Sequence, residues 1–120
     1  MRVKNEAYSL LLDILDKSKE EIIIIDNYAD KKLLDLLSKT SKKVKVYSKN
    51  MTEELLKKYN KQYKNVEVIN KDIFHDRFII IDKSILYNVG ASFKDLGNKC
   101  FSINKIEDKD IMDSILDKLK

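Results

Sequence analysis

Three short apolar runs alternate with helix-like segments over the first 70 residues, and this order is the strongest constraint on the fold. EIIIID at 21–26 is uninterrupted and β-branched, which is typical of a strand buried on both faces. KVKVYS at 43–48 alternates polar and apolar residues as a strand does, and NVEVI at 65–69 follows. Apolar residues at helical spacing fill the intervals, at 5–19, at 30–39 and after Met51. The alternation predicts right-handed crossovers and a parallel sheet with helices on its faces.

Helix start signals support these segments. Asn5 and Asp30 are predicted N-caps, because a side-chain oxygen at that position accepts a hydrogen bond from an orphan backbone amide. Thr52, with Glu53 and Glu54 in the first turn, predicts the start of a third helix.

The second half of the chain has a different rhythm. RFIIID and SILYNV are two strand-like runs joined around residues 82–84, which predicts a β-hairpin and an antiparallel section. CFSINKI predicts a further strand, and 110–119 predicts a closing amphipathic helix. The chain, 1–120, is therefore predicted to be a single α/β domain with a mixed, mostly parallel sheet flanked by helices.

The composition is that of a globular protein with a crowded ionic surface. The 120 residues are 43% hydrophobic and 37% charged, and 24 basic against 20 acidic side chains give a formal net charge of +4. So small a balance favours anionic partners only weakly. No apolar run is long enough to span a membrane and no signal-peptide pattern is present, so we expect a cytoplasmic protein without a membrane partner. The single cysteine, Cys100, excludes an internal disulfide and fits a reducing compartment.

The rarest residue types of the chain gather in one stretch, 70–97. It contains the only histidine, one of the two arginines and both glycines. If 75–81 is extended, His75 and Arg77 share a face, and Asp82 falls at the strand end on the opposite face. These are the first candidate site residues.

The loop after the hairpin, GASFKDLG, adds groups that suit an anion. Gly90 allows close backbone approach or a positive φ, and Ser92 and Lys94 offer a hydroxyl and an ammonium. Arg77 can clamp a phosphate with two parallel hydrogen bonds, and His75 can act as a nucleophile or a proton carrier. The stretch therefore predicts a phosphate site.

The spacing His75-x-Arg77-x4-Asp82, followed by Gly-Ala-Ser, resembles the motif of the phospholipase D superfamily, His-x-Lys-x4-Asp followed by a Gly-Ser or Gly-Gly turn. FHDRFIIID also resembles the motif strand of the small bacterial nucleases of that superfamily. The preceding α/β run resembles one half of its fold, so the resemblance implies a phospholipase D-like half over nearly the whole chain. Arg77 stands where the family usually has lysine, and Phe93 stands where it usually has asparagine.

The resemblance implies a specific chemistry. In that superfamily two motifs meet across a pseudo-twofold axis: one histidine attacks phosphorus, its partner protonates the leaving oxygen, and no metal or other cofactor is needed. This chain has one motif, so the resemblance implies a homodimer that acts on nucleic acid, with His75, Arg77 and Asp82 as the catalytic set. The phosphate-binding residues are then Arg77 and three residues of the loop, Gly90, Ser92 and Lys94.

Other interpretations stay open at this point. GASFKDLGNKCFSINKI is similar to the C-terminal region of phage-type regulatory proteins, which implies fusion to, or association with, a DNA-binding regulatory domain. The fold would then serve as a binding or dimerisation module without turnover, and the chain would be a fragment or a free-standing version of that tail. A plain α/β interaction domain with His75 paired in the core is a third alternative. Arg77 could pair with Asp76 or Asp95, and Asp82 could orient the hairpin backbone.

Overall fold

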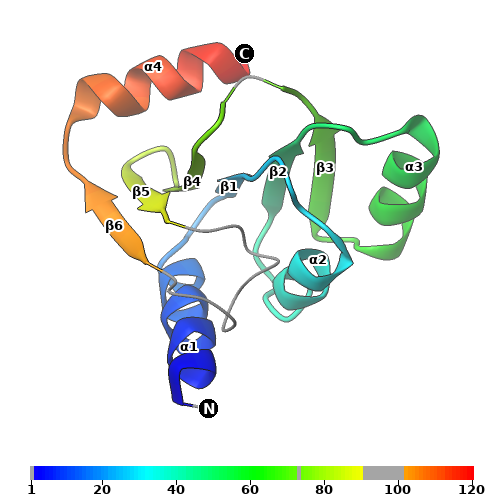
Figure 1. Cartoon of the computed structure of the whole chain (residues 1–120), viewed down its shortest axis with the longest axis horizontal. Helices are drawn as coiled ribbons and strands as arrows, with labels where there is room; N and C mark the ends of the chain where they lie inside the picture. The colour runs from blue at the N-terminus through cyan, green and yellow to red at the C-terminus, as the bar shows by residue number, and fades with distance from the viewer. Residues whose placement is uncertain (1, 73, 91–101) are drawn as a thin grey trace.

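Helices and strands alternate in the first half of the chain, and three consecutive strands follow in the second (Figure 1). The computed structural model describes residues 2–72, 74–90 and 102–120, with the side chains of the first helix from Ser9 onward. The elements are α1 (Arg2–Asp16), β1 (Ile22–Ile25), α2 (Lys31–Leu37), β2 (Val44–Ser48), α3 (Glu53–Gln62), β3 (Val66–Asn70), β4 (Arg77–Ile81), β5 (Ile85–Val89), β6 (Ile103–Ile106) and α4 (Lys109–Leu119). The predicted order of elements is confirmed.

The strands form one sheet in the order β3-β2-β1-β4-β5-β6. β1 pairs in parallel with β2, and β2 with β3, whereas β4 is antiparallel to both β1 and β5, and β5 to β6. The prediction of a mixed sheet flanked by helices is confirmed. Its antiparallel part is larger than predicted, because every strand after β3 runs opposite to its neighbours.

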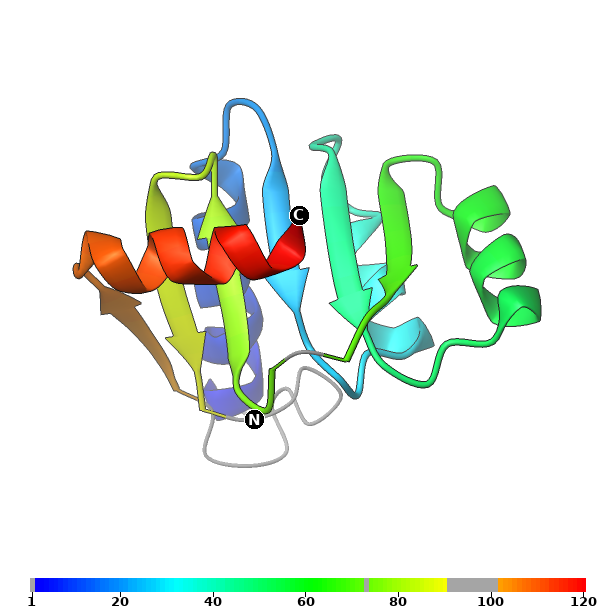
Figure 2. The same ribbon diagram turned by 90° about the horizontal axis from the view of Figure 1, so that it is seen from above.

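Helices cover both faces of this sheet (Figure 2). α1 and α2 lie on one face, α3 lies along the β3 edge, and α4 crosses the other face. The α1–α2 face carries the larger core, which includes Leu11, Leu15, Ile22, Ile24, Leu34, Leu37, Val46, Val68 and Ile79. The α4 face carries a second core, with Ile23, Ile25, Phe78, Ile80, Met112 and Ile115. β1 contributes to both cores, as its uninterrupted apolar run predicts.

Side-chain caps begin three of the described helices, and Asp108 caps α4 by accepting from the amide of Asp110. Asp30 caps α2 by accepting from two backbone amides of its first turn, and Thr52 caps α3 by accepting from the amide of Leu55, as predicted. The prediction that Asn5 is an N-cap is wrong, because α1 already begins at Arg2 and Asn5 lies inside it. No helix in the described ranges is long and apolar enough to cross a membrane.

The hairpin between β4 and β5 turns at Asp82 and Lys83, whose φ angles are 52° and 54°. Two consecutive positive φ values are typical of the type I′ turn, whose twist suits a hairpin but is strained for residues other than glycine. The Asp82 carboxylate accepts hydrogen bonds from the Ser18 hydroxyl and from the backbone amides of residues 19–21, at 2.8–2.9 Å. These contacts join the α1–β1 connection to the hairpin, which agrees with the expectation that Asp82 orients backbone.

Asp82 should make the fold sensitive to acid. Hydrogen bonds from the amides of Lys19 and Glu20 hold the pKa of its carboxyl well below the ordinary value. Because the folded-state pKa is depressed, the stabilisation is complete above the unfolded-state pKa of about 3.9 and is lost as the pH falls below it. We expect Asp82→Asn to lower the melting temperature by several degrees at neutral pH, and to flatten its decline between about pH 5 and pH 2.

Thermal melts followed by circular dichroism across this pH range measure both effects. Asp113→Asn, at an exposed position on α4, removes the same charge and should leave the melting curve close to that of the parent. If the parent chain and Asp82→Asn lose stability in parallel as the pH falls, the Asp82 contacts do not stabilise the fold in the way proposed.

Candidate functional site

His75 and Arg77 lie at the start of β4, at the end of the sheet where the parallel strands finish. Arg77 is the first residue of β4, but residues 75 and 76 form a bend. The prediction of one extended segment over 75–81 is therefore wrong at its beginning, and strand alternation does not place His75. His75 is exposed, so the alternative that pairs it in the core is also wrong.

His75 opens onto a hollow of about 510 Å³ between the start of β4 and α4. The rings of Phe74 and Phe78 line it in an edge-to-face arrangement, with centroids 5.9 Å apart, and the Lys118 ammonium lies over the Phe74 ring. The side-chain amide of Asn27 donates a hydrogen bond to the backbone carbonyl of Phe74. The residue before His75 is thus joined to the loop that follows β1.

Arg77 points to the other face of the sheet, toward the end of β1. Its Nε lies 3.8 Å from Oδ1 of Asp26, a carboxylate that is fully buried, whereas the Arg77 side chain is 24% exposed. Its guanidinium carbon also lies 5.8 Å from the centroid of the Tyr28 ring. Arg77 is therefore paired with Asp26 and not with Asp76; Asp95, the other predicted partner, lies outside the described residues.

Asp26 occupies the centre of a polar row across the strand ends. The register pairs Ile25 with Tyr47 on one side and with Phe78 on the other, so Asp26 lies between Ser48 of β2 and Arg77 of β4. Ser48 is fully buried, and its hydroxyl has no hydrogen-bond partner among the described residues. In open α/β sheets, the carboxyl ends of parallel strands are where ligands bind. The row therefore marks this end of the sheet as the candidate site.

Two further residues complete the cationic part of the site. Tyr28 follows β1 and is 49% exposed, and its backbone amide donates to Asp26 at 2.9 Å. Lys49 follows β2, and its ammonium lies 5.7 Å from the centroid of the same Tyr28 ring. One aromatic ring thus has two cations near it, Arg77 and Lys49, an arrangement that suits a bound anion.

The remaining predicted residues are only partly placed. The Gly90 amide donates to the carbonyl of Ser102 at 2.8 Å, and a Cβ on Gly90 would lie 2.2 Å from the Ser102 hydroxyl. Close approach explains this glycine without a positive φ, and its own amide is not free to donate to a phosphate. Ser92, Lys94 and Phe93 lie outside the described residues.

Asp82 is not brought together with His75 and Arg77, because it follows the last residue of β4 while they precede or begin that strand. Sequence reasoning also missed Asp26, Asn27, Tyr28 and Lys49. The signal for the first three was available, since they directly follow the apolar run IIII that forms the buried strand β1. Among the described residues, no group of three or more His, Cys, Asp or Glu side chains could hold a metal ion.

The ion pair between Asp26 and Arg77 should stabilise the fold. Asp26→Asn leaves the Arg77 guanidinium half-buried without its counter-charge, so we expect a loss of about 1–3 kcal/mol in the free energy of unfolding. Asp76→Asn removes an equal charge from an exposed position next to Arg77 and should change little. Urea denaturation of both variants measures the difference, and equal midpoints would show that the buried pair contributes nothing.

Comparisons with known proteins bear on the fold. No protein-family model and no curated protein matches the chain. It is similar to NucT from Helicobacter pylori, with a TM-score of 0.64 and 15% identity over 96% of this chain and 86% of that one. It is also similar to TrmBL2, an archaeal chromatin protein described as showing a novel mode of DNA binding, with a TM-score of 0.55 and 18% identity. That match covers 97% of this chain but 47% of TrmBL2. Identities this low concern the fold alone, which is an α/β fold with a six-stranded mixed sheet flanked by helices.

Proposed function

We propose that this chain is a phospholipase D-like phosphodiesterase domain that cleaves nucleic acid through a phosphohistidine at His75. The observation that carries the proposal is the placement of the His75-x-Arg77 pair at the ends of the parallel strands. There the loop after β1 fixes both residues, Arg77 through Asp26 and the neighbour of His75 through Asn27. His75 opens toward α4 and Arg77 points to the opposite face, so in this proposal the phosphoryl group lies beyond the strand ends, where a group from each face can reach it.

The reaction needs two histidines, and the chain has one, so the proposed enzyme is a homodimer with the site at its twofold axis. A ring nitrogen of His75 bonds to phosphorus while the bond from phosphorus to the leaving oxygen breaks. The partner subunit's His75, protonated beforehand, gives its proton to that oxygen. Water then attacks phosphorus, the phosphorus–nitrogen bond breaks, and the proton from water returns to the partner's His75.

Arg77 has an electrostatic role in this proposal. Its guanidinium binds the non-bridging oxygens, whose charge grows as phosphorus is attacked. Ser92 and Lys94 would add a hydroxyl and an ammonium as further phosphate donors. Asp82 would act through the position of β4 and not on phosphorus, because its carboxylate is bonded to the α1–β1 connection.

Nucleic acid is the proposed substrate for two reasons. The Lys49 ammonium lies near Arg77 on the Tyr28 ring, so the site offers more than one positive charge to a polyanion. TrmBL2, with a similar fold, is described as binding DNA.

A second candidate is a binding or dimerisation module without turnover, attached to or associated with a DNA-binding regulatory domain. The contact between Arg77 and the buried Asp26 favours it, since a carboxylate at 3.8 Å offsets the charge that a transition state would need. The chain also spans only about half of TrmBL2. Both candidates use the same surface, and turnover distinguishes them.

Cleavage of labelled single-stranded DNA in the presence of EDTA tests the enzyme. We expect cleavage by the unaltered chain, and a loss of at least about a hundredfold in His75→Ala, because the nucleophile and the proton donor are removed together. His75 is exposed, so the melting temperature of the variant should match that of the parent.

Analytical ultracentrifugation of the same samples should report a dimer. Cleavage that requires added metal, or that survives His75→Ala, rules out the phosphohistidine mechanism. A dimer that binds DNA and never cleaves it supports the binding module instead.

A further inference from the structure

We propose that Lys49 and Tyr28 build a second phosphate subsite beside Arg77, so that the site binds two consecutive phosphates of a single nucleic-acid strand. The inference rests on the proposed function, because it names how the substrate of that site is held. It assigns a binding role to Lys49 and a positioning role to Tyr28, neither of which belongs to the His-x-Arg-x4-Asp motif.

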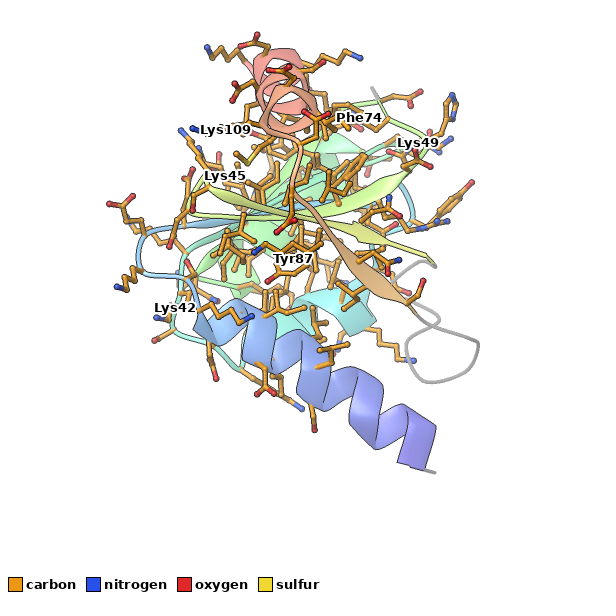
Figure 3. The ribbon with its side chains drawn as sticks, turned by 90° about the vertical axis from the view of Figure 1, so that its left-hand side faces the viewer. Lys42, Lys45, Lys49, Phe74, Tyr87 and Lys109 are labelled. Atoms are coloured by element: carbon orange, nitrogen blue, oxygen red, sulfur yellow. The ribbon has the colours of Figure 1, made fainter. Side chains whose placement is uncertain are left out.

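The position of Lys49 is determined by its neighbours on both sides. Ser48, before it, is fully buried at the end of β2, and Asn50, after it, adopts a φ of 61° that turns the chain away from the sheet. The next amide, of Met51, donates to the side chain of Asn70 at 3.2 Å. Lys49 therefore projects from a fixed point at the strand ends (Figure 3).

The Tyr28 ring lies close to both cations, Lys49 and Arg77. Its ring centroid lies 5.7 Å from the Lys49 ammonium and 5.8 Å from the guanidinium carbon of Arg77. The backbone of Tyr28 is fixed in turn by its hydrogen bond to Asp26. Both positive charges therefore lie beside the same ring, and a polyanion that spans it would meet two cations.

The two cations differ in how far their charge is already offset. The carboxylate of Asp26 lies 3.8 Å from Arg77, whereas no carboxylate of the described residues pairs with Lys49. Lys49 can therefore offer a full charge to a neighbouring phosphate. A compound with one phosphate would use Arg77 alone, and a polynucleotide would use both residues.

The salt dependence of binding tests the subsite. The probe is a labelled single-stranded DNA of about 12 nucleotides, bound to His75→Ala protein so that no cleavage occurs, with affinity measured by fluorescence anisotropy over a range of salt. Each phosphate contact on a single strand contributes about −0.7 to the slope of log K against log salt. We expect Lys49→Gln to make the slope less negative by about 0.7.

Lys45→Gln is the matched control. It makes the same substitution within β2, but Lys45 lies at the opposite end of the sheet from Lys49 (Figure 3) and should leave the slope unchanged. A dinucleoside monophosphate, which carries one phosphate, should bind equally well to Lys49→Gln and to its parent. Tyr28→Leu should weaken binding of the longer DNA about two- to fivefold with the slope unchanged, because the ring positions charges without carrying one.

An unchanged slope in Lys49→Gln, or an equal change in Lys45→Gln, overturns the inference even if the chain cleaves DNA. If the slope depends on Lys49 and the parent chain cleaves nothing, the enzymatic proposal fails while the subsite stands. Weaker binding of the single-phosphate compound by Lys49→Gln also overturns it, because Lys49 would then belong to the first phosphate site.

Discussion

The candidate site depends on one buried carboxylate. Asp26 ends the most buried strand of the sheet, where it cannot reach water and must be satisfied by protein donors. It accepts from the amide of Tyr28 and pairs with Arg77 on the neighbouring strand. One group therefore fixes the loop after β1 and the first residue of the motif strand together. Arg77 and the Tyr28 backbone owe their positions to this arrangement, whereas Lys49 reaches the same ring from the end of β2.

The same interaction limits what Arg77 can do. A guanidinium beside a carboxylate is well oriented, but part of its field is cancelled before any ligand arrives. Lys49 restores positive charge to the site without disturbing the buried pair, because it reaches the same ring from β2. The site thus separates two tasks that a single lysine could combine, orientation at Arg77 and uncompensated charge at Lys49.

Local sequence signals predicted the helices and strands, whereas the geometry of the candidate site depends on contacts between segments that are distant in the sequence. The runs that became β1, β2 and β3 were evident because burial leaves a periodic pattern, and Asp30 and Thr52 cap helices through contacts within one turn. The pairing of Asp26 with Arg77 depends on β4 joining the sheet beside β1, which the order of elements along the chain does not specify. The bend at residues 75 and 76 was missed for a related reason. The His-x-Arg spacing favours a strand, whereas the Phe74 carbonyl is bonded to the loop after β1.

The structure of the sheet explains the spacing between Arg77 and Asp82. The residues between Arg77 and Asp82 are the residues of β4 that pair with β1. At the hairpin end of β4, the Asp82 side chain accepts hydrogen bonds from the connection that leads into β1. Its own amide donates to the carbonyl of Glu21 at 2.9 Å, so the hairpin end of β4 is fixed against the start of β1. A slip of one residue would turn Arg77 to the α4 face, away from Asp26. Asp82 can therefore act on the candidate site from the opposite end of the strand, by setting the register that places Arg77 beside Asp26.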